Sequence, residues 1–162
     1  MHLFLHLKNF HIYHLILFFI FCIIVNSNYS LYYFNYSLYC IFHFLLLYLS
    51  LYNYRKILYI IYFFYGLGMD IFWLNEIGPH LFTFMLILAV VNKSRKYLTN
   101  LSAFKIYIFI LFLQLLMILV EKFISYILFS NPFDSMFFLK ISIISIILSY
   151  PIFILFSKID KI

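Results

Sequence analysis

Charged residues are scarce in this chain, and their scarcity excludes most soluble folds. Only 10% of the 162 residues are charged, whereas 67% are hydrophobic and the mean hydropathy is +1.08. A typical soluble domain has about 25% charged residues. The composition therefore predicts an all-α, polytopic membrane protein, and the length allows one integral membrane domain covering residues 1–162.

The residue types that catalytic sites use are also few. The chain has five acidic residues, and its two cysteines, Cys22 and Cys40, lie in apolar runs typical of small hydrophobic side chains. It has no nucleophile elbow, phosphate-binding loop or Glu-x-x-His motif. The net charge of +6 comes without a basic patch interleaved with polar side chains. We therefore expect no enzymatic activity, no cofactor, no disulfide and no nucleic-acid partner.

Four N-terminal histidines have spacings that can share a metal ion. His2 and His6 are four residues apart, and His11 and His14 are three apart. No Cys, Asp or Glu lies near them to complete a ligand set. We therefore predict no metal site there.

Six apolar segments can be drawn along the chain. They cover residues 10–25, 31–51, 57–74, 77–91, 104–129 and 136–156. A straight crossing of a bilayer needs about 20 residues, so the first and fourth segments are short. No small-residue cleavage site follows the first segment, so we expect a retained span and not a signal peptide.

The basic residues predict the orientation of these segments. With the N-terminus in the cytoplasm and six crossings, the external loops near residues 26–30, 75–78 and 130–135 hold no Lys or Arg. All eleven basic residues except Lys122 and Lys140 then lie on the cytoplasmic side. Cytoplasmic loops are typically enriched in Lys and Arg. We therefore predict six spans with both termini in the cytoplasm.

One stretch, residues 65–80, holds an unusual share of the rare residue types. It contains all three glycines, one of three prolines, the only tryptophan and an aspartate in apolar surroundings. An aspartate in a membrane helix costs about 2.5–3.5 kcal/mol, so it usually faces protein or water. The stretch therefore predicts an internal seam or site, with the candidate residues Gly66, Gly68, Asp70, Trp73, Gly78, Pro79 and His80.

Spacing predicts the local structure of this stretch. Gly66, Asp70 and Trp73 follow an i, i+4, i+7 pattern and would share one face of a helix. Gly78-Pro79 predicts a turn and a new helix, because proline fits the first helical turn.

Three readings of Asp70 remain open. We expect a structural contact, either an ion pair with Lys122 or Lys140 at similar depth or a hydrogen-bonded seam between helices. A ligand site and an interfacial cap on the loop at Asn75 are the alternatives.

Two further polar patterns lie in the last two segments. Gln114, Glu121 and Ser125 share one helical face, with Lys122 beside it, and such faces usually bind another helix through hydrogen bonds. A proton or ion relay would need more titratable partners than these. In the sixth segment, Ser142, Ser145 and Ser149 predict a packing face, and we expect Tyr150-Pro151 to end or kink the helix.

The central stretch resembles a known family motif. Gly66-Leu67-Gly68-Met69-Asp70, with Gly78 eight residues after the aspartate, resembles the central motif of the rod shape-determining protein MreD family. The basic run 93–96, and Tyr150-Pro151 before a short basic tail, are similar too. The resemblance covers roughly residues 57–162. This chain departs from the family at Leu74-Asn75-Glu76, where members often have glycine and proline, and at Leu81-Phe82-Thr83, where small residues are common.

The resemblance implies a function and partners. Members of the family are inner-membrane proteins with five or six spans that act as non-enzymatic scaffolds of the elongasome, which directs peptidoglycan synthesis and maintains rod cell shape. The implied partner is MreC, and through it MreB and the cell-wall synthases.

Two other classes are weighed against the scaffold. A substrate-binding subunit of an energy-coupling-factor type transporter is also small, with six spans, and its pocket would use Asp70, Trp73, Asn75, Glu76 and His80. Such a pocket needs polar groups from more than one helix, whereas the sequence indicates one helix-turn. A small membrane enzyme needs a titratable cluster, for which we identify at most Asp70, Glu76 and Glu121.

Overall fold

A computed structural model describes residues 5–26, 32–52, 55–74, 77–98, 102–132 and 134–160, all of them helical or in short connections. The described helices are α1 (Leu5–Asn26), α2 (Tyr32–Tyr52), α3 (Ile57–Met69), α4 (Pro79–Leu98), α5 (Ala103–Phe129) and α6 (Ser135–Asp160). A short π-helix, η1 (Asp70–Leu74), continues α3. No strand occurs in these residues, so the predicted all-α class is confirmed.

Within the described residues, three helices are long and apolar enough to cross a membrane. The qualifying stretches are Tyr33–Tyr52 in α2, Ala103–Phe129 in α5 and Ser135–Lys158 in α6. The other helices carry shorter apolar stretches, Ile12–Asn26, Ile57–Phe72 and Pro79–Ser94. The expectation of a membrane protein agrees with these lengths and compositions.

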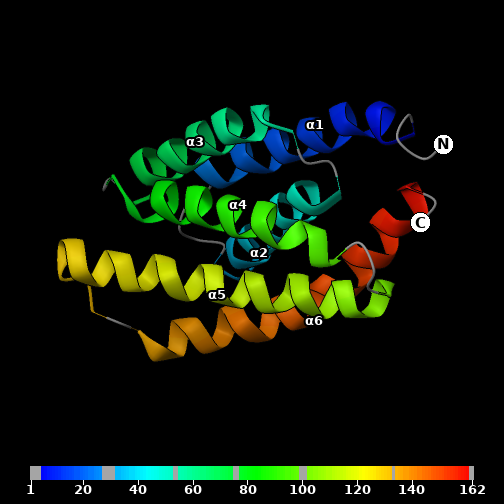
Figure 1. Cartoon of the computed structure of the whole chain (residues 1–162). Coiled ribbons are helices and arrows are strands. Elements are labelled where there is room, and N and C mark those ends of the chain that lie inside the picture. The colour runs from blue at the N-terminus through cyan, green and yellow to red at the C-terminus, as the bar shows by residue number, and fades with distance from the viewer. Residues whose placement is uncertain are drawn as a thin grey trace.

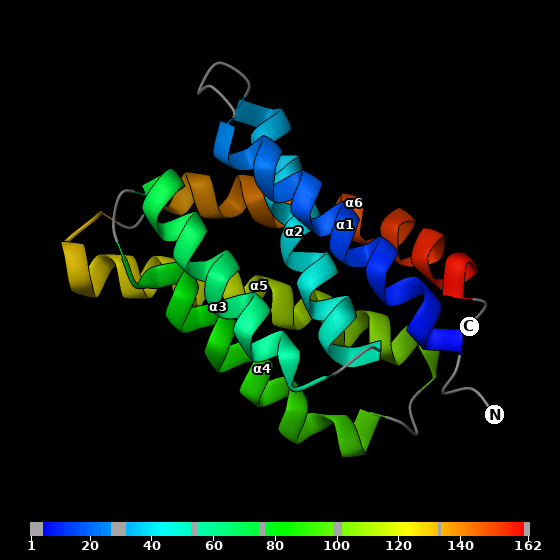
Figure 2. The ribbon, with the colours of Figure 1, turned by 90° about the horizontal axis from the view of Figure 1, so that it is seen from above.

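Helix α2 is the central helix of the bundle. It packs against α1, α4, α5 and α6, and 72% of its apolar stretch is buried, compared with 28% for α5 and 22% for α6. In Figure 1 the α3–α4 hairpin lies above the α5–α6 pair, and Figure 2 shows α2 crossing between them. Polar side chains on α2 are therefore placed to meet groups from several other helices.

Helices α4 and α6 run further than the sequence predicted. The predicted fourth segment ended at residue 91 and the fifth began at 104, but α4 continues through the basic run to Leu98. Lys and Arg are good helix formers and interact favourably with the C-terminal end of a helix. The prediction for residues 57–74 agrees with α3 and η1, whereas Asn75 and Glu76 lie outside the described residues.

Of the two alternatives expected at Tyr150-Pro151, an end or a kink of the helix, the end is wrong. The helix includes this proline and continues to Asp160. Beyond it, the ring of Phe156 packs 5.3 Å from those of Tyr13 on α1 and Tyr48 on α2. This aromatic contact buries Phe156, so tertiary packing stabilises the helix past the proline.

Candidate functional site

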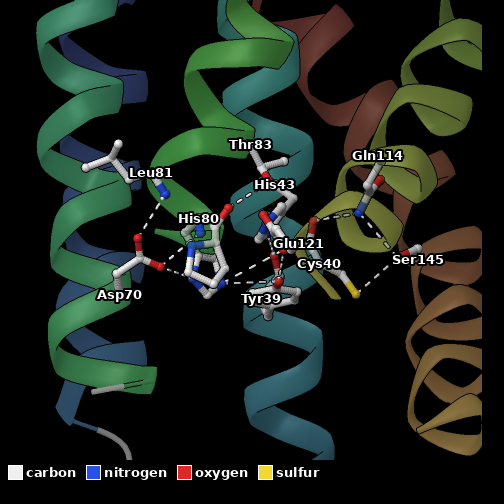
Figure 3. Close-up of polar contacts among 11 residues, drawn as sticks. Tyr39, Cys40, His43, Asp70, His80, Leu81, Thr83, Gln114, Glu121 and Ser145 are labelled. Carbon is white, nitrogen blue, oxygen red and sulfur yellow. Dashed lines mark hydrogen bonds and ion pairs between the residues drawn. The ribbon is translucent and has the colours of Figure 1, made fainter. Parts of the chain in front are cut away.

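A layer of buried polar side chains crosses the bundle at one level. We call it the polar layer, and it joins η1, α4, α2, α5 and α6 in a row (Figure 3). Every member is at most 3% exposed, so each is withdrawn from solvent and lipid. The members are Tyr39, Cys40, His43, Asp70, His80, Gln114, Glu121 and Ser145.

Asp70 caps the N-terminus of the neighbouring helix α4. Its Oδ2 accepts hydrogen bonds from the backbone N–H groups of Gly78 (2.8 Å) and Leu81 (3.1 Å). Its Oδ1 accepts the backbone N–H of His80 at 2.9 Å and faces Nδ1 of the His80 imidazole, also at 2.9 Å. The carboxylate thus binds the N–H groups that a helix start leaves unpaired, at the positive end of the helix dipole.

Gly78 and Pro79 give α4 the start that this cap requires. Gly78 has a φ of +143°, which side-chain-bearing residues rarely adopt, and its carbonyl accepts the N–H of Phe82 at 2.9 Å. Pro79 is the first residue of α4, where its missing N–H leaves no donor unpaired. The predicted turn and helix start are confirmed, and Asp70 accounts for the remaining donors of the first turn.

Gly66 allows α3 and α4 to pack closely beside the cap. A Cβ atom at Gly66 would lie 2.6 Å from Cα of Leu81, a backbone atom of α4. At Gly68 a Cβ would meet only the far end of the Phe21 ring, at 2.5 Å, and this ring belongs to a flexible side chain. The two glycines of the motif therefore differ, since only the first is required by contact between helix backbones.

His80 carries the network from Asp70 into the bundle. Its Nε2 lies 3.4 Å from the hydroxyl of Tyr39 and 3.9 Å from Oε2 of Glu121. The Tyr39 hydroxyl donates to the same Oε2 of Glu121. The three side chains come from α4, α2 and α5, so this contact holds three helices together.

His43 binds the other oxygen of Glu121. Its Nε2 lies 2.9 Å from Glu121 Oε1, and its Nδ1 lies 2.8 Å from the backbone carbonyl of Tyr39, one helical turn earlier. Two carboxylates and two imidazoles therefore lie in the same buried row. A buried charge is costly unless it is paired and hydrogen-bonded. Each carboxylate here contacts an imidazole and also accepts a hydrogen bond from another group, a backbone N–H for Asp70 and the Tyr39 hydroxyl for Glu121.

Gln114 extends the polar layer from α5 to α6. Its Nε2 donates to the carbonyl of Cys40 at 2.8 Å and to Oγ of Ser145 at 3.3 Å. The Ser145 hydroxyl donates to the sulfur of Cys40 at 3.1 Å. Gln114, Glu121 and Ser125 are all buried on one face of α5, as their spacing predicts.

The other predicted residues lie elsewhere. The ion-pair expectation named Lys122 or Lys140 as the partner of Asp70. The structure instead pairs Asp70 with His80. The ammonium group of Lys122 lies 4.2 Å from the centre of the Phe137 ring, and Lys140 is exposed on α6. Trp73 lies in η1, but its side chain is outside the described residues, as is Glu76. Among the residues described, no three His, Cys, Asp or Glu side chains are grouped as metal ligands.

The sequence analysis missed Tyr39 and His43. The chain has 16 tyrosines and 6 histidines, so neither residue type stands out by itself. A usable signal was their i, i+4 spacing within an apolar segment that holds no Asp, Glu, Lys or Arg. A histidine there, like the aspartate of the third segment, needs a buried partner.

Comparison with known proteins gives no relative: no family model, curated protein or solved structure matches this chain. The function must therefore be inferred from the residues and their geometry.

Proposed function

We propose that this chain is a non-enzymatic scaffold of the MreD type in the bacterial inner membrane, where it binds an MreC-like partner and supports rod-shaped growth. In this proposal all six helices cross the membrane and both termini are cytoplasmic. Support for that orientation comes from the basic residues, which avoid the proposed external loops. Tyr13 in α1 also packs against Phe156 near the end of α6. This contact fits an even number of crossings, which places both ends of the chain on the same side.

The observation that carries the proposal is the construction of the α3–α4 turn. Three of the residues that resemble the MreD motif have a structural role here: Gly66 at the backbone contact, Asp70 as the cap, and Gly78 at the positive φ. A short motif that builds one rigid turn fits a protein whose task is to present a fixed surface. The partner would then bind the outward apolar faces of the helices and their short connections, where Phe64 (63% exposed), Phe72 (63%) and Phe82 (56%) provide anchors.

A pull-down tests the scaffold. The tagged chain would be extracted from native membranes in mild detergent and its bound proteins identified by mass spectrometry. We expect an MreC-like protein with a single membrane span in the wild type and in Gly68→Ala, and its loss in Gly66→Leu, which forces α3 away from α4. Recovery of that partner with Gly66→Leu at wild-type yield would show that the turn does not position the binding surface.

A substrate-binding subunit of an energy-coupling-factor type transporter is the second candidate. The specific observation in its favour is that polar groups from four elements, α2, η1, α4 and α5, converge in the polar layer. These groups bind one another, which favours the scaffold. Recovery of ATPase subunits and a second membrane protein in the same pull-down would instead favour the transporter.

A further inference from the structure

The polar layer has a proton count that can be worked out from its contacts. Asp70 receives two N–H groups on each oxygen, and three of the four are backbone groups that can only donate. The carboxylate therefore has no free lone pair for a proton of its own. With Asp70 ionised, as three backbone donors favour, its fourth partner, Nδ1 of His80, donates and so carries a hydrogen.

The contact between His43 and Glu121 also holds one proton. Nδ1 of His43 faces a backbone carbonyl, which can only accept, so Nδ1 carries a hydrogen. At the 2.9 Å contact between Nε2 and Glu121 Oε1, one hydrogen lies either on the nitrogen or on the oxygen. In both cases the His43–Glu121 pair has no net charge.

Nε2 of His80 is a second position in this row whose proton the contacts leave open. It faces the Tyr39 oxygen, whose own hydrogen is directed to Glu121. With a proton on Nε2, His80 donates to Tyr39 and its positive charge balances Asp70. Without that proton, the layer keeps one uncompensated negative charge, which is costly in a buried setting.

We propose that the His80–Tyr39–Glu121 contact is a binding site for one exchangeable proton, with Tyr39 as the relay. When the proton moves inward, the N–H bond of His80 Nε2 breaks and an O–H bond to Tyr39 forms. With the shared proton held by His43 and Glu121 ionised, the original Tyr39 hydrogen then passes to Glu121 Oε2, so His80 becomes neutral and Glu121 protonated. Chains of Asp, Glu and His within membranes commonly carry protons in this way. This site goes beyond the scaffold role and does not depend on it.

The groups that face this site come from each helix packed around it. Helix α2 provides Tyr39, His43 and the Cys40 thiol, η1 provides Asp70, and α4 provides His80. Helix α6 reaches the layer through Ser145 by way of Gln114, whereas the cation of α6, Lys140, is exposed. Tyr39 lies between His80 and Glu121, so it is the residue whose loss interrupts the relay with least change in charge.

Polar groups continue along α5 from Glu121 toward its C-terminal end. Ser125 is 7% exposed, one helical turn after Glu121 on the same face, and its Oγ accepts a hydrogen bond from Asn131 at 3.0 Å. Asn131 follows the end of α5 and is half-buried. In this proposal protons enter from the side of the α5–α6 connection, where these polar groups lie.

Nitrogen NMR of the histidines tests the proposal. The full chain in lipid nanodiscs would carry ¹⁵N-histidine and ¹³C-proline, because Pro79-His80 is the single Pro-His pair in the sequence and assigns His80 without a variant. Between about pH 5 and pH 9, the range in which histidines titrate, we expect Nε2 of His80 to lose its proton while Nδ1 keeps it. An unchanged His80 across this range, or loss of the proton from Nδ1, would overturn the proposal.

Two tyrosine variants separate the relay from a general effect of losing a hydroxyl. Tyr39→Phe removes the acceptor of the His80 proton, and we expect a roughly tenfold lower proton affinity, about one pH unit in the midpoint. Tyr62→Phe is the matched control, since this buried hydroxyl donates to the carbonyl of Leu46 and not to the polar layer. Equal midpoints in Tyr39→Phe, Tyr62→Phe and the wild type would exclude Tyr39 as the relay. None of these results affects the pull-down, so the two proposals fail separately.

Discussion

Asp70 and His80 are ten residues apart in the chain, and their side chains meet at 2.9 Å across the α3–α4 turn. The same carboxylate accepts three backbone N–H groups from the start of α4. One residue thus caps a helix and orients a histidine toward the centre of the bundle. The geometry of the turn is therefore coupled to the polar layer, and a change at Asp70 should affect both.

The first prediction concerns the cap. Asp70→Asn keeps one acceptor oxygen but places an NH₂ group against backbone N–H donors, leaving buried donors unpaired. We expect a loss of about 2–5 kcal/mol in the free energy of unfolding, since breaking a buried pair leaves its partner uncompensated. Thermal unfolding in mild detergent, followed by circular dichroism, measures the change.

Asp134→Asn is the matched control for that experiment. Asp134 also caps a helix, with its Oδ1 accepting the N–H groups of Met136 (3.0 Å) and Phe137 (3.1 Å), but it is exposed. Asparagine caps exposed helix starts about as well as aspartate, so no clear change is expected. Equal stability of both variants would mean that Asp70 is not the buried cap described above.

The second prediction compares two glycines that are two residues apart. Gly66→Ala places a Cβ against the Leu81 backbone, so α3 and α4 must separate, at a cost of about 1–3 kcal/mol. In Gly68→Ala the Phe21 ring can turn away, and alanine favours the helix by about 1 kcal/mol over glycine. We expect the first variant to unfold at a lower temperature and the second at or above that of the wild type. The reverse order would rule out the close approach at Gly66.

The helices and the α3–α4 turn were largely predictable, because both depend on local sequence. Apolar runs, the Gly-Pro pair and the isolated Asp70 each carry a signal within a few residues. The ends of α4 and α6 were not predictable in the same way. Helix α6 passes Pro151 because Phe156 packs on α1 and α2, and that contact joins residues more than a hundred positions apart.

The composition of the polar layer depends on tertiary contacts that spacing does not reveal. Asp70 and Glu121 were identified because acids in apolar segments are conspicuous, whereas Tyr39 and His43 are common, uncharged residue types here. The expected lysine partner for Asp70 was wrong because similar depth does not mean a shared helix face. His80 lies at the start of the next helix, within reach of a carboxylate that already caps it.

The third prediction concerns the contact between His43 and Glu121. His43→Phe leaves Glu121 without one of its partners, and Glu121→Leu removes one partner from His43 and one from Tyr39. The double variant removes both groups at once, so we expect it to be less destabilised than the sum of the two. A coupling free energy of about 1–3 kcal/mol is typical for residues in one buried network. Strictly additive losses would show that the two side chains do not interact.

The last prediction tests the orientation of α5 and, with it, the six-span arrangement. Ser102 and Ser135 are both exposed and lie beyond opposite ends of α5, whose 27 residues extend about 40 Å and exceed the bilayer core. In a background of Cys22→Ala and Cys40→Ala, single cysteines at these two positions would be treated with a membrane-impermeant maleimide. We expect Ser135→Cys to react in intact spheroplasts and Ser102→Cys to react only after lysis. The opposite pattern would place the basic residues outside and reverse the proposed orientation, and labelling of both in intact spheroplasts would mean that α5 does not cross the membrane.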